Sequence, residues 1–271
     1  MRKRNFRTRG TGVAGWMTAP GMLGCYFLPL GMTFGYAVVN SAFDRRFAGL
    51  SNFRYLLSNR YFLLGCRNTL EIGGEALGIG MMFILIIGFL LDQHPRLLRR
   101  AVGILLLPLL MPSVSAVGVW MTVFHTNTLL PDSDARAALT TLFLWQHTGI
   151  GALLLAAALR SLPRELMDAA ALDGAGRLRT FLRIQLPNVR NALAMDGMLL
   201  MMFFLRIYKE GYLLFGLYPS EDVYLLQHYM NHQYLKMSFQ HVAASAVLLV
   251  LATAAGYLGL YMGIRRKGKA G

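Results

Sequence analysis

The chain contains several uninterrupted apolar stretches, each long enough to cross a lipid bilayer. A membrane helix needs about 20 mainly apolar residues to span the hydrocarbon core. Of the 271 residues, 55% are hydrophobic and 15% are charged, which is too apolar for a water-soluble domain of this size. The runs lack the alternation of a β-barrel strand. The sequence therefore predicts an all-α membrane protein with one domain, residues 16–264. Its six expected spans are Trp16–Val39, Thr69–Leu91, Ala101–Phe124, Ala137–Leu159, Ala192–Gly216 and His241–Ile264.

The basic residues lie mainly in alternate connecting segments. The formal net charge is +14, and 18 of the 27 Lys and Arg residues fall in residues 1–10, 92–100, 160–190 and 265–269. These four segments share one side if the six spans alternate, and the positive-inside rule makes that side the cytoplasm of a bacterial cell. Both ends of the chain, the basic segments 1–15 and 265–271, are then cytoplasmic. Basic flanks of membrane spans explain the charge without a nucleic-acid partner.

The first outer connection contains a short amphipathic pattern. Ser51 is a plausible N-cap, and Phe53, Leu56 and Leu57 repeat at helical spacing. Such a helix is expected to lie along the outer membrane interface. It serves either as a surface anchor or as a contact for a partner protein.

The connection between spans four and five, within residues 161–190, predicts a helical hairpin. Pro163 suits the start of a helix, and Glu165 in its first turn favours the helix dipole. Gly174 is placed to end this helix. A second helix is expected over about Gly176–Leu186, ended by Pro187.

Apolar side chains share one face on each helix of this hairpin. The residues are Leu166, Ala169 and Ala170 on the first helix, and Leu178, Phe181 and Leu182 on the second. Periodicity alone leaves two interpretations open: the hairpin folds back on its own bundle, or it docks on another protein.

The residues of the hairpin resemble a known loop. Asp168-Ala169-Ala170, then Asp173-Gly174-Ala175, then Ile184-Gln185-Leu186-Pro187 are similar to the coupling loop, or EAA motif, of binding-protein-dependent ABC importer permeases. Two positions depart from that pattern. Asp168, a carboxylate shorter by one methylene, replaces the usual Glu at the position of the salt bridge to the ATPase. Asn191 stands where a proline often follows.

The resemblance extends to the outer connection and indicates a branch of the family. Residues 47–53, Phe-Ala-Gly-Leu-Ser-Asn-Phe, resemble the segment after the first span in the first permease of the carbohydrate (maltose-type) branch. The resemblance implies the type I ABC importer permease fold. It further implies a heterodimer with a second permease subunit, two ATP-binding subunits, and an extracytoplasmic solute-binding protein that delivers a sugar or oligosaccharide. A permease for a non-sugar solute is the alternative.

In terms of the family, the hairpin docks on the ATPase. The residues expected to take part are Glu165, Asp168, Ala169, Ala170, Asp173, Gly174, Ala175, Phe181, Ile184, Leu186 and Pro187. No phosphate-binding Gly-x-x-x-x-Gly-Lys-Ser/Thr sequence occurs in the chain, so ATP and Mg²⁺ are expected on the partner ATPase subunits. No nucleophile with a base is apparent either, and we expect no catalytic centre and no cofactor in this chain.

Polar residues within or near the spans are candidates for the solute path. Arg67, Glu71 and Glu75 repeat at i, i+4 and i+8 near the expected outer end of span two, where Arg67 and Glu71 can also form a plain structural ion pair. A second group lies in span five and joins aromatic faces to hydrogen-bonding groups, which suits a sugar but also an interfacial aromatic belt. Its members are Arg206, Tyr208, Lys209, Glu210 and Tyr212.

Other classes of protein fit the sequence less well. An ion-coupled secondary transporter would carry acids near the membrane midplane and two repeat halves, whereas the clear acids, Glu71 and Glu75, are expected near one end of their span and no internal repeat is visible. A membrane assembly factor would need only the hairpin. His228 and His232 are four residues apart, but no third metal ligand is apparent nearby in an expected outer loop.

Overall fold

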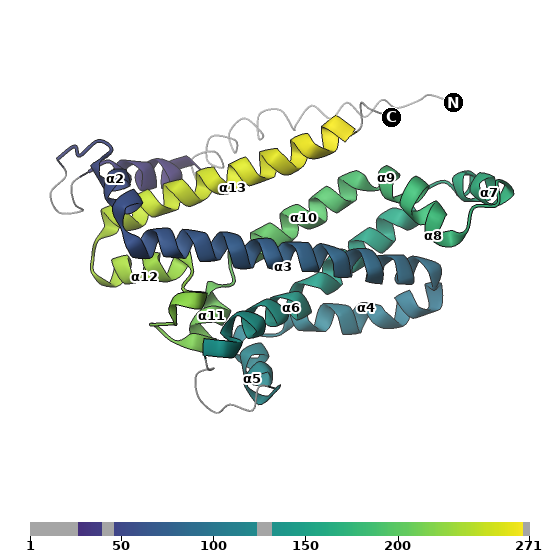
Figure 1. Ribbon diagram of the computed structural model, residues 1–271, viewed down its shortest axis with the longest axis horizontal. Coiled ribbons are helices and arrows are strands. Elements are labelled where there is room, and N and C mark those ends of the chain that lie inside the picture. The colour runs from purple at the N-terminus through teal and green to yellow at the C-terminus, as the bar shows by residue number, and fades with distance from the viewer. Residues whose placement is uncertain (1–26, 40–45, 124–131, 268–271) are drawn as a thin grey trace, which may run out of the picture. The chain divides into compact units, whose positions relative to one another are not determined.

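The structure is a computed structural model that describes residues 27–39, 46–123 and 132–267 (Figure 1). These segments are almost entirely helical, which confirms the all-α prediction. Residues 27–37 form the first described helix. The elements that follow are α2 Ser51–Ser58, α3 Arg60–Gln93, α4 Pro95–Leu110, α5 Ser113–Val123, α6 Asp132–Arg160, α7 Arg164–Leu172, α8 Arg177–Thr180, η1 Phe181–Gln185, α9 Leu186–Asn188, α10 Arg190–Phe204, α11 Tyr208–Phe215, η2 Glu221–Val223, α12 Leu226–Leu235 and α13 Phe239–Lys267.

Among the described residues, three helices are long and apolar enough to cross a membrane: α3, residues Ala135–Arg160 of α6, and residues Phe239–Met262 of α13. Two bent pairs, α4 with α5 and α10 with α11, satisfy the same criterion if each counts as one span. These elements correspond to the second through sixth predicted spans. Of the first predicted span, residues 16–26 lie outside the described residues.

The third predicted span is broken, which the sequence-based expectation of a continuous helix missed. The axes of α4 and α5 differ by 99° across a gap of two residues. Pro112 occupies this gap, and the residue before it, Met111, has the extended conformation that a following proline favours. Pro108 lies inside the last turn of α4 and provides no backbone N–H. Two prolines four residues apart therefore end the helix and redirect the chain.

The second span also differs from its predicted boundary. It begins at Arg60, not Thr69, and its 34 residues run without a break to Gln93. At 1.5 Å per residue such a helix is about 51 Å long, well beyond the roughly 30 Å of the hydrocarbon core. Glu75 lies 15 residues from Arg60 and 18 from Gln93, near the middle of the helix. The sequence places Glu75 near the outer end of the apolar run, and α3 continues for 15 residues beyond it to Arg60.

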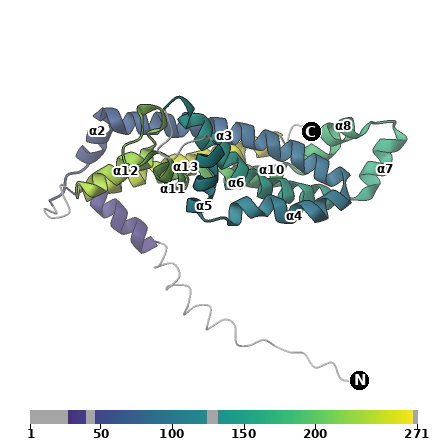
Figure 2. The ribbon, with the colours of Figure 1, turned by 90° about the horizontal axis from the view of Figure 1, so that it is seen from below.

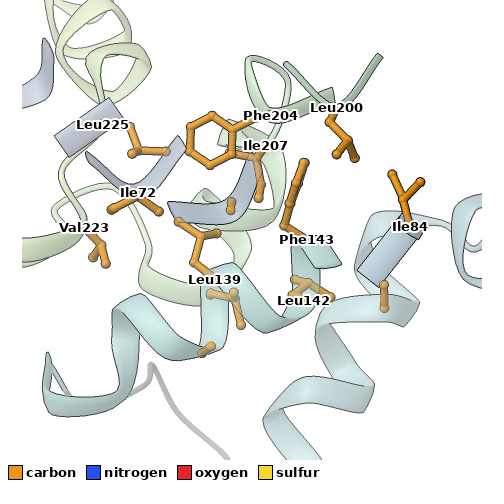
Figure 3. Close-up of a cluster of buried hydrophobic side chains, with 14 of the residues drawn as sticks. Ile72, Ile84, Leu139, Leu142, Phe143, Leu200, Phe204, Ile207, Val223 and Leu225 are labelled. Carbon is orange, nitrogen blue, oxygen red and sulfur yellow. The ribbon is translucent and has the colours of Figure 1, made fainter. Parts of the chain in front are cut away.

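The chain divides into two compact units, Arg60–Tyr229 with Ala252–Gly271, and Met1–Asn59 with Met230–Leu251. In the larger unit, α3, α4, α6 and α10 run side by side, and the α7–α8 hairpin projects from one end of them (Figures 1 and 2). Their shared core gathers buried aliphatic and aromatic side chains from α3, α6 and α10 (Figure 3). Examples are Ile72, Leu139, Phe143, Leu200 and Phe204.

In the smaller unit, one buried side-chain amide joins α2 to the end of the first described helix. The side-chain N–H₂ of Asn52 on α2 donates to the carbonyl oxygens of Ala37 and Val39, each at 2.8 Å. The ring of Tyr55 stacks on that of His241, with 4.3 Å between centroids. The predicted helix is confirmed, but its N-cap is Leu50, not Ser51, and no side chain caps it.

Candidate functional site

The hairpin between α6 and α10 has a well-defined turn after its first helix. The N–H of Gly174 donates to the carbonyl of Ala171, and the N–H of Ala175 donates to that of Ala170, both at 3.0 Å. These two hydrogen bonds form a Schellman motif, which requires the residue after the helix to adopt the left-handed backbone conformation. Gly174 supplies it with φ of +71°. The predicted end of the first helix is therefore confirmed, and glycine is needed because a side chain would be strained there.

The second helix of the hairpin does not stop at Pro187, contrary to expectation. After α8 the chain widens into a π-helical turn at Phe181–Gln185 and continues through α9 before α10 begins at Arg190. Pro187 lies in the first turn of α9, where a missing N–H is tolerated. The π-turn breaks the regular ladder just before the proline, which removes the clash that would otherwise end the helix.

The base of the hairpin is anchored on the membrane helices. Phe181 is buried and its ring lies 4.6 Å from that of Phe89 on α3. The side-chain amide of Gln185 donates to the Asp92 carboxylate at 3.4 Å. Arg160, at the end of α6, donates to the carbonyl of Leu91 at 3.1 Å. Phe181 and Gln185 thus tie the hairpin to the end of α3, and Arg160 ties the end of α6 to the same part of α3.

Three leucines of the hairpin are exposed. Leu172 is 90% exposed, Leu178 60% and Leu182 51%. No other described segment of the larger unit covers these side chains. Isolated exposed leucines are common on proteins, but three on one short hairpin outside the bundle indicate a surface that contacts something else.

The structure separates the predicted docking residues into two groups. Ala170 and Phe181 are buried, so any contribution of theirs to docking is through the shape of the hairpin. The exposed members are Glu165, Asp168, Ala169, Asp173, Gly174 and Pro187. Ala175, Ile184 and Leu186 are half-buried. Leu172, the most exposed of these side chains, was missed because it lies beside the helix face that Leu166, Ala169 and Ala170 share.

At the far end of the larger unit, Glu71 lies between two arginines. Its carboxylate accepts a hydrogen bond from Arg67 Nε at 2.6 Å and forms an ion pair with Arg136 of α6 at 3.6 Å. The predicted Arg67–Glu71 pair is therefore present. Arg136 was not predicted as a partner, because only the fold brings α6 beside this part of α3.

The polar residues of the fifth span lie around the bend between α10 and α11. Glu210 accepts a hydrogen bond of 2.6 Å from the Ser113 hydroxyl at the start of α5. Tyr208 packs edge-on against the ring of His228, 4.9 Å between centroids, and Tyr212 is exposed. Arg206 and Lys209 are exposed as well. The broken spans α4–α5 and α10–α11 thus meet through a polar contact at this end.

A buried amide fixes the segment that follows α11. The side chain of Asn68 donates to the carbonyls of Glu221 and Tyr224, at 2.6 and 3.0 Å. Arg60 makes an ion pair with the Glu221 side chain at 2.8 Å. Desolvation, followed by the nearby Tyr61 and Tyr208, raises the pKa of Tyr224 to about 12. Sequence reasoning missed Asn68, since a single asparagine gives no periodic signal.

Asp196 was also missed. It lies on α10, is 1% exposed, and neither carboxylate oxygen has a hydrogen-bond partner among the described residues. The comparison with an ion-coupled transporter used only the acids Glu71 and Glu75. An acid within the apolar run Ala192–Leu205 was the available signal.

His228 lies on α12, which the sequence had placed in a loop. Its Nδ1 accepts a hydrogen bond from the Leu225 N–H at 3.1 Å. Within the described segments, no group of three or more His, Cys, Asp or Glu side chains is arranged to hold a metal ion.

The fold and the hairpin define a class: a multi-pass helical membrane protein with broken spans and an exposed helical hairpin at one end. A match to a protein family supports this class and identifies it more specifically. Residues 80–262 match the family described as "Binding-protein-dependent transport system inner membrane component". The match covers more than half of the chain, so the chain belongs to this family. The resemblance to binding-protein-dependent importer permeases is confirmed, and the chain is a transport component, not an enzyme.

Individual relatives are similar over most of their length. The chain is 30% identical over 217 residues to the sn-glycerol-3-phosphate transport system permease protein UgpA of Pectobacterium atrosepticum, covering 73% of this chain and 70% of that protein. It is 26% identical over 231 residues to the xylose/arabinose import permease protein XacH of Haloferax volcanii, covering 79% and 73%.

Two crystal structures share the fold. One is of a bacterial ABC transporter involved in the import of the acidic polysaccharide alginate, with a TM-score of 0.78, 19% identity, and coverage of 94% of this chain and 95% of that chain. The other is of the bacterial alginate transporter in complex with an alginate pentasaccharide-bound periplasmic protein, with a TM-score of 0.73, 17% identity and 94% coverage of each chain.

Proposed function

We propose that this chain is a permease subunit of an ATP-driven importer for a sugar or a related polyhydroxylated solute. With a second permease subunit it encloses the solute path, and its hairpin docks on one of two ATP-binding subunits. An extracytoplasmic binding protein delivers the solute, and lipid surrounds the spans. The observation that carries this proposal is the hairpin, which presents exposed leucines beside a Schellman turn at one end of a membrane bundle.

The distribution of charge supports placing the hairpin in the cytoplasm. The basic residues flank the ends of α3, α6 and α10 from which the hairpin projects, and the positive-inside rule assigns that side to the cytoplasm. Both ends of the chain and the plasma-membrane location follow from the same assignment. ATP and Mg²⁺ are bound by the ATPase subunits in this scheme.

The anchors of the hairpin support a mechanical role. Its first helix follows α6 after three residues, and its second leads through a π-turn into α10. Phe181 and Gln185 attach its base to α3. A displacement of the docked hairpin is therefore passed to three membrane helices together, which is what alternating access requires of rigid levers.

The polar residues at the other end are proposed as part of the solute path. They are Glu71 and Glu75 on α3, and Arg206, Tyr208, Lys209, Glu210 and Tyr212 around the bend between α10 and α11. The hydrogen bond between Ser113 and Glu210 joins two spans that are both broken at this level. Broken spans allow polar groups to line a cavity at membrane depth, and exposed aromatic and hydrogen-bonding groups suit the two kinds of surface on a sugar.

The solute class rests on the relatives. Their names refer to sn-glycerol-3-phosphate, xylose and arabinose, and alginate, all of which carry several hydroxyl groups. A thermal-shift screen of the cognate binding protein against xylose, arabinose, sn-glycerol-3-phosphate and alginate oligosaccharides tests this assignment. A shift with an amino acid or peptide alone would contradict it.

Leu172→Glu tests the docking. Leu172 is 90% exposed, so a charge there leaves the fold intact, but it would be desolvated against the apolar cleft of an ATPase. We expect loss of ATPase co-purification and of ATP-driven uptake, with an unchanged melting temperature of the isolated chain. Arg177→Glu, an equally polar change at an exposed hairpin position, is the control. Wild-type assembly and uptake by Leu172→Glu would refute the assignment.

A further inference from the structure

Asp196 is an acid in the interior of the larger unit that the proposed function does not use. It lies on α10, about 9 Å along the helix axis from Arg190, and is buried. Neither of its carboxylate oxygens has a hydrogen-bond partner within the described part of the chain. A buried polar group without a partner is rare in folded proteins and calls for an explanation.

Three acids elsewhere in this unit show the pairing that Asp196 lacks. Glu71, Asp92 and Glu210 each accept a hydrogen bond from a side chain of their own or a neighbouring element, at 2.6, 3.4 and 2.6 Å. Acids within membrane helices are costly, and those that occur pair with other groups or face water, often at functional positions. Asp196 differs from these three acids because it is buried without a partner in the described arrangement.

The surroundings of Asp196 come from three helices. A Cβ built on Gly151 of α6 would lie 3.7 Å from Asp196 Oδ1 and would overlap the side chain of Ile84 on α3, which is fully buried. Leu200, one turn further along α10, lies at the same helix contact, because a Cβ on Gly80 of α3 would lie 3.1 Å from it. The carboxylate therefore lies in an apolar contact between α3, α6 and α10, where its burial disfavours this arrangement of the helices.

The three helices around Asp196 are attached to the hairpin in different ways. α6 ends at Arg160 and reaches the hairpin through a link of three residues, whereas α10 follows the hairpin through the helical turns of η1 and α9. α3 contacts the base of the hairpin through the side chains of Phe181 and Gln185. A displacement of the hairpin therefore acts most directly on α10, and a movement of α10 against α3 and α6 would open the contact that encloses Asp196.

We propose that Asp196 is a conformational device: its carboxylate is dry in the described arrangement and becomes hydrated in a second arrangement of the transport cycle. The inference rests on the proposed function, in which an ATPase drives such a cycle. The balance between two conformations depends on their difference in free energy, so a cost carried by one of them shifts the populations. The buried acid lowers the stability of the described arrangement and so makes that arrangement easier to leave.

A cysteine beside the acid reports hydration while Asp196 itself stays in place. The experiment uses the complete importer in proteoliposomes, without Cys25 and Cys66, either trapped with ATP and vanadate or free of nucleotide. Ile84→Cys should react with a small water-soluble thiol reagent at least fivefold faster in one of these two states than in the other. Ile72→Cys, equally buried on the same helix, is the control and should react slowly in both. Equal rates for Ile84→Cys in the two states overturn the proposal.

Removal of the acid should stabilise the chain and slow the transporter. We expect Asp196→Val to keep or raise the melting temperature of the isolated chain, to retain the ATPase subunits on purification, and to lower the rate of ATP hydrolysis by the reconstituted importer at least fivefold. Asp196→Asn keeps a buried polar group of the same shape and should retain at least half of the wild-type rate. If Asp196→Asn is as slow as Asp196→Val, a contact of the charge carries the function, and the proposal is overturned.

The outcomes separate this inference from the proposed function. A wild-type rate of ATP hydrolysis by Asp196→Val, or a melting temperature below that of the wild type, overturns the role of Asp196 and leaves the importer assignment standing. If the wild-type chain co-purifies with no ATPase subunit at all, the proposed function itself fails.

Discussion

The backbone of Gly149 on α6 lies directly against the backbone of Leu105 on α4. A Cβ on Gly149 would lie 3.2 Å from the Leu105 Cα and would overlap its carbonyl oxygen. The two helices meet at a point where only a hydrogen atom fits, so the size of residue 149 sets the distance between them.

Gly149→Ala should therefore destabilise the larger unit. Backbone atoms cannot move aside as a side chain does, and overpacking of this kind costs about 1–3 kcal/mol. We expect a lower melting temperature in detergent. Gly103→Ala, two residues before Leu105 with nothing within 4 Å, should leave it unchanged. Equal melting temperatures would show that the helices are not in contact here.

Asn68→Asp should loosen the segment after α11. The amide of Asn68 donates two hydrogen bonds that an ionised carboxylate of the same shape cannot donate, and two buried carbonyls lose their partner. The free energy of unfolding should fall by about 1–3 kcal/mol. Limited proteolysis is expected to cut within residues 216–225 faster than in wild type. Asn188→Asp, which removes one exposed local bond, is the control and should not change the cleavage rate.

Asp196→Val should maintain or raise the melting temperature. The carboxylate is buried without a described partner, and replacing such a group by an apolar side chain is commonly neutral or stabilising. Leu200 lies one turn along the same helix and is 2% exposed. Leu200→Asp would bury a new carboxylate without a partner and should lower the free energy of unfolding by about 3 kcal/mol or more. If the melting temperatures of both variants fall by the same amount, the Asp196 carboxylate has a partner that stabilises it in the buried position.

Gly174→Ala should weaken the hairpin, whereas Gly176→Ala should not. Neither Cβ would meet another atom within 4 Å, but φ is +71° at Gly174 and −65° at Gly176. A side chain in the left-handed region costs about 1 kcal/mol. The measurement is the affinity of the purified permease for the ATPase subunit. Identical affinities in the two variants would mean that the turn does not shape the docking surface.

Cysteine labelling should place the hairpin and α2 on opposite sides of the membrane. In a background without Cys25 and Cys66, a membrane-impermeant thiol reagent should label Ser58→Cys in intact cells. Arg177→Cys, exposed on the hairpin, should react only after lysis. Labelling of Arg177→Cys in intact cells would place the hairpin outside and contradict docking on a cytoplasmic ATPase.

The sequence by itself determined the class of the protein, its helical spans and the hairpin. Apolar length and helical period are properties of contiguous residues, so Ala137–Leu159 can be recognised as a span without knowing its neighbours. Gly174 is similarly local, because the left-handed turn depends on the conformation of one residue. The resemblance around Asp168–Pro187 then identified the family, which residues 80–262 confirm.

Only the tertiary structure decided where the polar groups lie and which of them meet. Arg136 reaches Glu71, Ser113 reaches Glu210, and Asn68 reaches Tyr224 across 65, 97 and 156 positions of the chain. Such pairs depend on the packing of distant helices, and an isolated polar residue carries no periodic signal of its partner. The same holds for Glu75, whose position at mid-helix became clear only when α3 was seen to begin at Arg60. Span boundaries and polar contacts are set by packing, whereas the spans are set by apolar composition and the break after α4 by two prolines.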